Sequence, residues 1–182
     1  MIFIDLICES LEAGVFLKLD GVRRKDREIK SFNKMENILR RASVCHVGTY
    51  GDGYPYVTPF NYFYARGVIA IHLSKEGKVF RNLLKHKRVC VEALEAGKVI
   101  KADSACKTGM QYRSVIAFGE AKIVEERRAK KMWLQKMLDK YRPDRKYSPM
   151  QGQDVDEVAV VVIRLKRVTG KEREVGPVRV RH

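Results

Sequence analysis

The segment from Gly53 to Tyr62 holds the residues best suited to bind a flat ligand. It reads Gly-Tyr-Pro-Tyr-Val-Thr-Pro-Phe-Asn-Tyr, so a hydroxyl and an amide lie among four aromatic rings. Because proline has no N–H to donate, a strand here needs an edge or a bulge at Pro59, which leaves backbone groups free. A planar heteroaromatic ligand needs such groups beside an apolar wall. An ordinary aromatic edge strand explains the same pattern, and periodicity alone favours that explanation.

A second segment, residues 71–82, has the features of a phosphate site. A strand pattern ends at Ser74, which we expect to cap a short helix, and Lys78 and Arg81 follow. Free N–H groups at a helix start and nearby positive charge favour an anion. The spacing of a Walker loop is absent, and lysines at helix starts are usually only solvated. His72 could bind substrate or cofactor, although a histidine in a strand more often has a structural role.

The cysteines and histidines form no recognisable catalytic or metal-binding motif. Cys8, Cys45, Cys90 and Cys106 include no C-x-x-C pair, so no metal site is predicted. Cys45 and Cys90 lie in apolar strand patterns and are expected to be buried. His46 follows Cys45 directly and points to the opposite strand face, which excludes a simple nucleophile–base pair.

The elements that must position these segments follow from periodicity. Apolar residues at three- and four-residue spacing predict a helix over Asp26–Ala42, and further helices are expected over 78–86 and 125–141. A polar stretch, 95–110, is predicted to be a long loop, with a short strand at 99–100 as the alternative. Alternating or continuous apolar patterns predict strands at 44–50, 54–64, 68–73, 89–94, 112–124 and 155–168.

Six strands joined mainly by hairpins predict a mainly β protein, with an antiparallel barrel and flanking helices. A doubly wound sheet would need a helix after nearly every strand. The formal charge of +15 over 182 residues favours an anionic ligand of some kind. The aromatic residues lie away from most basic runs, so nucleic acid is not expected as a partner. The sequence has no run of eighteen apolar residues, so no membrane span is expected.

Taken in order, several segments resemble the nitroimidazole-resistance branch of the pyridoxamine 5′-phosphate-oxidase-like, FMN-binding split-barrel proteins. The match extends from about Val22 to Glu174, which defines a barrel domain, 22–174, an N-terminal extension, 1–21, and a basic tail, 175–182. The extension has no basic start or cleavage site, so we expect it to pack on the domain or its partner, in a cytoplasmic protein. The matching segments are 23–29, 53–61, 71–78, 88–90, 114–119 and 168–171.

The resemblance implies a six-stranded antiparallel split barrel that forms a homodimer with two FMN sites at the interface. It implies no catalytic residue, but the corresponding histidine of the resistance proteins is associated with the substrate pocket, which is the alternative role for His72. The implied cofactor contacts are Thr58, Pro59, Phe60 and Asn61 at the isoalloxazine ring, His72 and Leu73 at the ribityl chain, Lys78 and Asn82 at the phosphate, and Tyr112, Arg113 and Ser114 from the partner subunit.

The function implied is a flavin-dependent oxidoreductase that reduces a small aromatic or nitro-bearing molecule. FAD or a deazaflavin is the alternative cofactor, and a flavin- or haem-binding module without turnover is the alternative function. The C-terminal Trp and Arg pattern of the true pyridoxamine-phosphate oxidases has no match here, since Arg179-Val180-Arg181 lacks the tryptophan. Pyridoxamine phosphate is therefore not the expected substrate.

Overall fold

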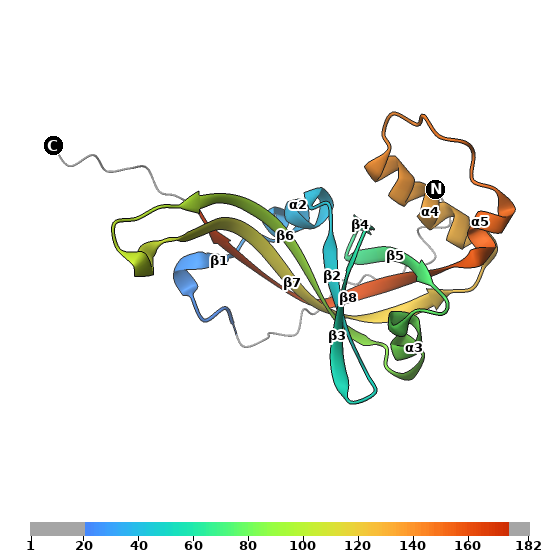
Figure 1. Ribbon diagram of the computed structural model, residues 1–182, viewed down its shortest axis with the longest axis horizontal. Coiled ribbons are helices and arrows are strands. Elements are labelled where there is room, and N and C mark those ends of the chain that lie inside the picture. Colours follow the sequence, from blue (N-terminus) through green and yellow to red (C-terminus); the bar gives the residue numbers. More distant parts are fainter. Residues whose placement is uncertain (1–20, 175–182) are drawn as a thin grey trace.

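A computed structural model describes residues 21–174 as one antiparallel sheet with helices around it (Figure 1). The N-terminal extension, apart from Gly21, and the basic tail lie outside the described residues. In chain order the elements are η1 (Lys25–Arg27), β1 (Glu28–Ile29), α2 (Phe32–Arg41), β2 (Cys45–Gly51), β3 (Tyr54–Phe60), β4 (Tyr62–Ala65), β5 (Val68–Ser74), α3 (Lys78–Lys85), β6 (Arg88–Ile100), η2 (Ala105–Lys107), β7 (Gly109–Val124), α4 (Arg127–Tyr141), α5 (Gly152–Glu157) and β8 (Val158–Arg173).

The strand order makes the sheet a split barrel. Neighbours run β3-β2-β6-β7-β8-β5-β4, with β1 added on β8. The strands β3 and β4 therefore lie at opposite ends of this order, yet only Asn61 separates them in the chain. The sheet must curl until its two ends meet at Asn61. The remaining gap between β3 and the β4–β5 end is called the split below.

Two apolar clusters fix this curvature. The larger one fills the barrel with alternate residues of the central strands and the inner side of α2, among them Leu39, Val47 and Ile71. The smaller one lies between the other face of β5 and β8 and the helices α4 and α5, around Trp133. Because β8 has a cluster on each side, its residues 159–163 are all buried.

The predicted fold class, mainly β with an antiparallel barrel, is confirmed, although the described residues form eight strands rather than six. The first helix begins at Phe32 with Ser31 as its N-cap, because Glu28 and Ile29 pair with β8 instead. The loop predicted for 95–110 is confirmed only for residues 101–108, and the short strand expected at 99–100 belongs to β6. Residues 96–100 continue β6 past a register shift and pair with β7, which makes the long hairpin of Figure 1.

The aromatic strand predicted for 54–64 is interrupted at Asn61, whereas Pro59 pairs with His46 without a bulge. Asp52 and Gly53, with φ of 52° and 83°, form the two-residue turn before β3, so Gly51 and Tyr54 are a hydrogen-bonded pair. Hydrogen-bonded and non-hydrogen-bonded pairs alternate from there along the two strands. The N–H and C=O groups of every odd-numbered residue of β3 therefore point away from β2. Proline is tolerated there because its missing N–H would face the free edge.

Candidate functional site

The predicted ring contacts and His72 come from the two ends of the sheet. Thr58, Pro59 and Phe60 come from β3, Asn61 lies where the two ends of the sheet meet, and His72 lies on β5 opposite. The structure thus brings Asn61 and His72 together at one cavity, although the β4–β5 hairpin separates them in the sequence. Lys78, the predicted phosphate contact, is the first residue of α3, just after β5.

Free backbone groups lie on both sides of the split. On β3 the alternation leaves the N–H of Val57 and the carbonyls of Pro55, Val57 and Pro59 without a strand partner among residues 21–174. On β5 the pairing with β4 ends at Ile71, so no strand of the described part of the chain lies beside His72 on that side. A strand edge of this kind presents donors and acceptors at the spacing that a heteroaromatic ring can bind.

The hydroxyl of Thr58 supplies a further unpaired group. Thr58 lies opposite Val47, so its side chain points to the inner face of β3. Its Oγ1 is buried and has no hydrogen-bond partner among the described residues. A buried hydroxyl without a partner costs free energy, so its presence here favours a ligand that hydrogen-bonds to it.

Lys78 gives the far end of the split its positive charge. Gly77 is the N-cap of α3, and the Lys78 ammonium lies 5.0 Å from the centroid of the Tyr56 ring. Ser74, predicted as the cap, instead accepts a hydrogen bond at Oγ from the Glu76 N–H and closes a turn before the helix. The arrangement joins free helix N–H groups, an ammonium and an aromatic face, which suits a phosphate next to an organic group.

Asn82, the other predicted phosphate contact, is buried beneath α3. Its side chain is 1% exposed and its Nδ2 donates to Thr49 Oγ1 at 3.0 Å. The Thr49 hydroxyl donates in turn to the carbonyl of Tyr56 at 3.2 Å. Asn82 therefore holds α3 against β2 and β3 from inside. Thr49 and Tyr56 complete this chain, and neither stood out in the sequence except as a member of a strand pattern.

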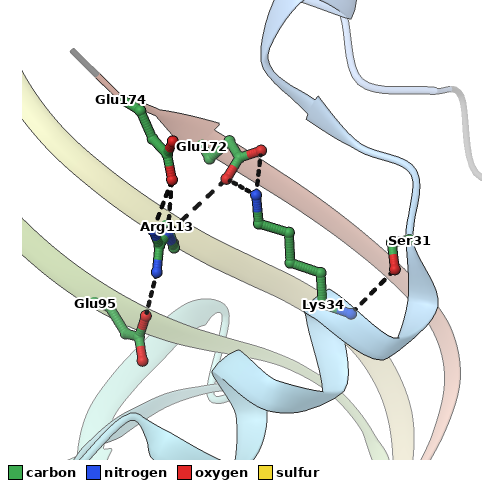
Figure 2. A network of polar contacts seen from close by, with 6 residues as sticks. All are labelled: Ser31, Lys34, Glu95, Arg113, Glu172 and Glu174. Atoms are coloured by element: carbon green, nitrogen blue, oxygen red, sulfur yellow. Dashed lines mark hydrogen bonds and ion pairs between the residues drawn. The ribbon is translucent and has the colours of Figure 1, made fainter. Parts of the chain in front are cut away.

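Tyr112, Arg113 and Ser114 do not share one face of β7. Tyr112 and Ser114 point to the outer face of the barrel, whereas Arg113 points to the side of α2, as period-two alternation requires. Figure 2 shows Arg113 among three carboxylates. Its Nη2 lies 2.6 Å from Glu174 Oε1, and Glu95 and Glu172 lie 3.9 Å away. The hydrogen bond from Arg113 lowers the pKa of Glu174.

The outer face that carries Ser114 combines exposed apolar side chains with the His46–Glu92 pair, and the described helices do not cover it. Val57 on β3 is 61% exposed, Phe118 on β7 is 40% exposed and Leu94 on β6 is 39% exposed. The register of β3, β2, β6 and β7 places all three on this face. Beside Ser114 a cavity of about 320 Å³ lies under Gly21 and its neighbours. Contiguous exposed apolar surface is typical of an interaction site.

His72 faces away from the barrel interior, while Leu73 points into it and is only 8% exposed. The imidazole lines an apolar cavity of about 280 Å³ that also reaches Asn61 at the split. Desolvation by the surrounding side chains lowers the pKa of His72, which favours the neutral ring although the residue is still exposed. The sequence reasoning missed the other residues that line this cavity, because they come from distant segments: Leu134, Met137, Leu138, Tyr141, Met150, Asp154 and Val158.

Residues 21–174 contain neither a membrane-spanning helix nor a metal-binding cluster. No helix there is long and apolar enough to cross a membrane. No three His, Cys, Asp or Glu side chains of that range are grouped so that they could hold a metal ion. Of the cysteines expected to be buried, Cys45 is fully buried and Cys90 is half-buried.

Comparison with known proteins agrees with this geometry. Residues 33–172 match the profile of the family described as pyridoxamine 5′-phosphate oxidase, whereas no curated protein matches the sequence. A candidate 5-nitroimidazole antibiotic resistance protein from Bacteroides thetaiotaomicron is 24% identical, with a TM-score of 0.70 over 80% of this chain and 86% of its own. The flavocytochrome Anf3 from Azotobacter vinelandii is 22% identical, with a TM-score of 0.76 over 86% and 74%. An FAD and haem binding protein from Mycobacterium smegmatis is 19% identical, with a TM-score of 0.75 over 83% and 75%.

Proposed function

Because the chain belongs to the pyridoxamine 5′-phosphate oxidase family, we propose that it binds a flavin along the split of its barrel. The observation that carries the proposal is the unpaired Thr58 hydroxyl between two free strand edges, with Lys78 at the end of the gap. The ring would contact Thr58, Pro59, Phe60 and Asn61, and the phosphate would lie at the start of α3. FMN fits best, since one such helix start with one lysine suits a single phosphate group.

We expect two copies of the chain to form a homodimer through the outer face. Its exposed Val57, Leu94 and Phe118 would be buried there, and Tyr112 and Ser114 would meet the flavin of the other copy. Arg113 is not part of this contact in our proposal, because it points to the other side and is neutralised by carboxylates. Replacement of Phe118 by Glu should shift the sedimentation of the protein from dimer to monomer.

A bound flavin would supply electron transfer, and the chain would bind and orient the second reactant. The cavity beside His72 is the candidate substrate site, because it adjoins the split at Asn61 and is large enough for one ring. The neutral imidazole can accept a proton or donate a hydrogen bond there. The proposed activity is reduction of a small aromatic or nitro-bearing molecule.

A second candidate is a haem- or flavin-binding module without turnover. The observation in its favour is His72 at the wall of an apolar cavity, because histidine is a common ligand of haem iron; the cavity of about 280 Å³ would have to open further to admit a tetrapyrrole. Two of the similar structures are described as a flavocytochrome and as an FAD and haem binding protein. A Soret band that disappears in His72→Ala would favour this candidate, whereas a flavin spectrum without it favours the first.

The flavin proposal is tested by absorbance of the purified protein and by the mass of the compound that heat releases. A mass for FMN supports the proposal, and a mass for FAD or a deazaflavin would change the cofactor. Thr58→Val and Lys78→Met should each weaken flavin binding, while Lys131→Met, an exposed lysine of α4, should not. A protein that binds none of the three flavins when they are added would refute the proposal.

A further inference from the structure

The cavity beside His72 differs in charge from the rest of the molecule. The protein carries a formal charge of +15, yet none of the described residues that line this cavity of about 280 Å³ is a lysine or an arginine. Asp154 of α5 is the one carboxylate among them. Leucine, methionine and tyrosine side chains of α4 form most of the remaining wall. The described wall is therefore apolar and negative within a strongly positive protein.

Three cations of the surrounding elements are engaged elsewhere. Arg127, at the start of α4, places Nε 2.9 Å from Asp156 Oδ1. Lys140, near the end of α4, donates to the carbonyl of Ala42 at 2.8 Å. Lys75, just after β5, donates to the carbonyl of Asp156. Because none of the three lines the cavity, a ligand there meets no cationic side chain of residues 21–174.

The start of α5 fixes the position of the Asp154 carboxylate. Gln151 is the N-cap of this helix, and its backbone N–H donates to Asp154 Oδ2 at 2.6 Å as one half of a capping box. The second oxygen, Oδ1, accepts no hydrogen bond within residues 21–174. A capped carboxylate with one oxygen left over is a positioned acceptor at the wall of the cavity.

Asn61 and His72 supply the other polar groups that a ligand can meet. The amide of Asn61 offers both a donor and an acceptor. Desolvation lowers the pKa of His72 and favours the neutral imidazole, which offers one of each. These groups can satisfy the polar substituents of a neutral ring. A carboxylate or phosphate on the ring would lose its hydration without gaining a cation, and the loss costs binding free energy.

We infer that this cavity selects neutral or cationic aromatic rings and rejects acidic ones, and that Asp154 sets the preference. The inference rests on the proposed function, because it concerns the cavity proposed there as the substrate site. A cationic or N–H-bearing substituent would face Asp154 Oδ1, and the ring would lie against the apolar wall of α4. Acidic rings are excluded from the cavity although the net charge draws anions to the surface of the protein.

The experiment uses three nitro probes of one shape: neutral 4-nitrobenzamide, cationic 4-nitrobenzamidine and anionic 4-nitrobenzoate. Each is titrated into the full-length purified protein by calorimetry at pH 7 and constant ionic strength, without a reductant, so that binding is measured apart from turnover. Trp133, the one tryptophan of the sequence, packs with Leu134 and Met137 of the cavity wall, so quenching of its fluorescence by the nitro group locates the bound probe. We expect 4-nitrobenzoate to bind at least about tenfold more weakly than the other two.

Two variants of α5 connect the preference to one carboxylate. Asp154→Asn removes the charge and keeps an oxygen that can accept the Gln151 N–H, so it should weaken 4-nitrobenzamidine about three- to fivefold, strengthen 4-nitrobenzoate about threefold and leave 4-nitrobenzamide within about twofold. The matched control is Glu157→Gln, one turn later, because Glu157 is exposed, bonds to Gln153 and does not line the cavity. It should change none of the three affinities by more than about twofold.

The outcomes separate this inference from the proposed activity. Binding of 4-nitrobenzoate as tight as that of 4-nitrobenzamide, no binding of any probe, or equal effects of Asp154→Asn and Glu157→Gln would each overturn the inference. A protein that shows the expected affinities but reduces no probe once a reductant is added would refute the proposed activity alone. Reduction of all three probes at equal affinity would support the activity and refute the selectivity.

Discussion

Replacement of Asn82 by alanine separates a structural role from a cofactor contact. The substitution removes the hydrogen bond to Thr49 and leaves a space under α3, because Asn82 is 1% exposed. A buried hydrogen bond contributes about 1 kcal/mol, and the uncollapsed space adds about 1–2 kcal/mol. We therefore expect the free energy of unfolding to fall by about 2–3 kcal/mol, with Tm lower by about 4–12 °C for a chain of this size. Urea unfolding followed by circular dichroism measures the change.

A double-mutant cycle with Thr49→Val tests the origin of this loss. The two substitutions should couple by at least about 0.5 kcal/mol, since each removes a partner of the other. As a control, Lys85→Met breaks the exposed pair with Asp52 and should cost under about 1 kcal/mol. A loss below about 0.5 kcal/mol in Asn82→Ala, or strict additivity with Thr49→Val, would refute the reasoning.

The variants Asn82→Ala and Thr49→Val also decide whether Asn82 contacts a flavin phosphate. If Asn82 only positions α3, Thr49→Val and Asn82→Ala should weaken flavin binding to a similar extent. If Asn82 contacts the phosphate directly, Asn82→Ala should weaken binding much more than Thr49→Val does. Equilibrium titration with FMN, monitored by flavin fluorescence below the unfolding temperature of both variants, measures the difference.

Three further predictions concern the barrel and its titratable groups. Gly119→Ala should destabilise the protein by more than about 2 kcal/mol, because its Cβ would lie 2.5 Å from a backbone oxygen of β8, whereas Gly48→Ala, with 3.5 Å to its nearest atom, should cost much less. Burial raises the pKa of Cys45 to about 12, so iodoacetamide should label exposed Cys106 and spare Cys45 until unfolding, as peptide mapping would show. Burial lowers the pKa of Lys140 from 10.5 to about 8 in the folded state. Between these two pH values the unfolded chain therefore binds more protons than the folded protein does. Denaturation should show stability rising across that range, and less so in Lys140→Met.

The sequence by itself determined the local structure of most of the barrel. Period-two apolar patterns fix which residues of a strand share a face, and the Asp52-Gly53 and Arg66-Gly67 pairs adopt the positive φ of tight hairpins. The prolines of β3 correctly indicated an edge strand. These features could be predicted because they depend on neighbours in the chain.

The tertiary structure decided what depends on distant partners. Residues 96–100 contain Gly97 and Lys98 and have only Val99 and Ile100 as a strand pattern, so the continuation of β6 through them depends on pairing with β7. Strand alternation shows that the side chains of His72 and Leu73 point to opposite faces of β5. Only the position of α4 shows that His72 faces the cavity. Asn82 is equally suitable for a phosphate contact or a buried hydrogen bond, and the closeness of Thr49 settles its position. The split itself arises because the two ends of a curled sheet meet at Asn61, a long-range closure that local sequence does not encode.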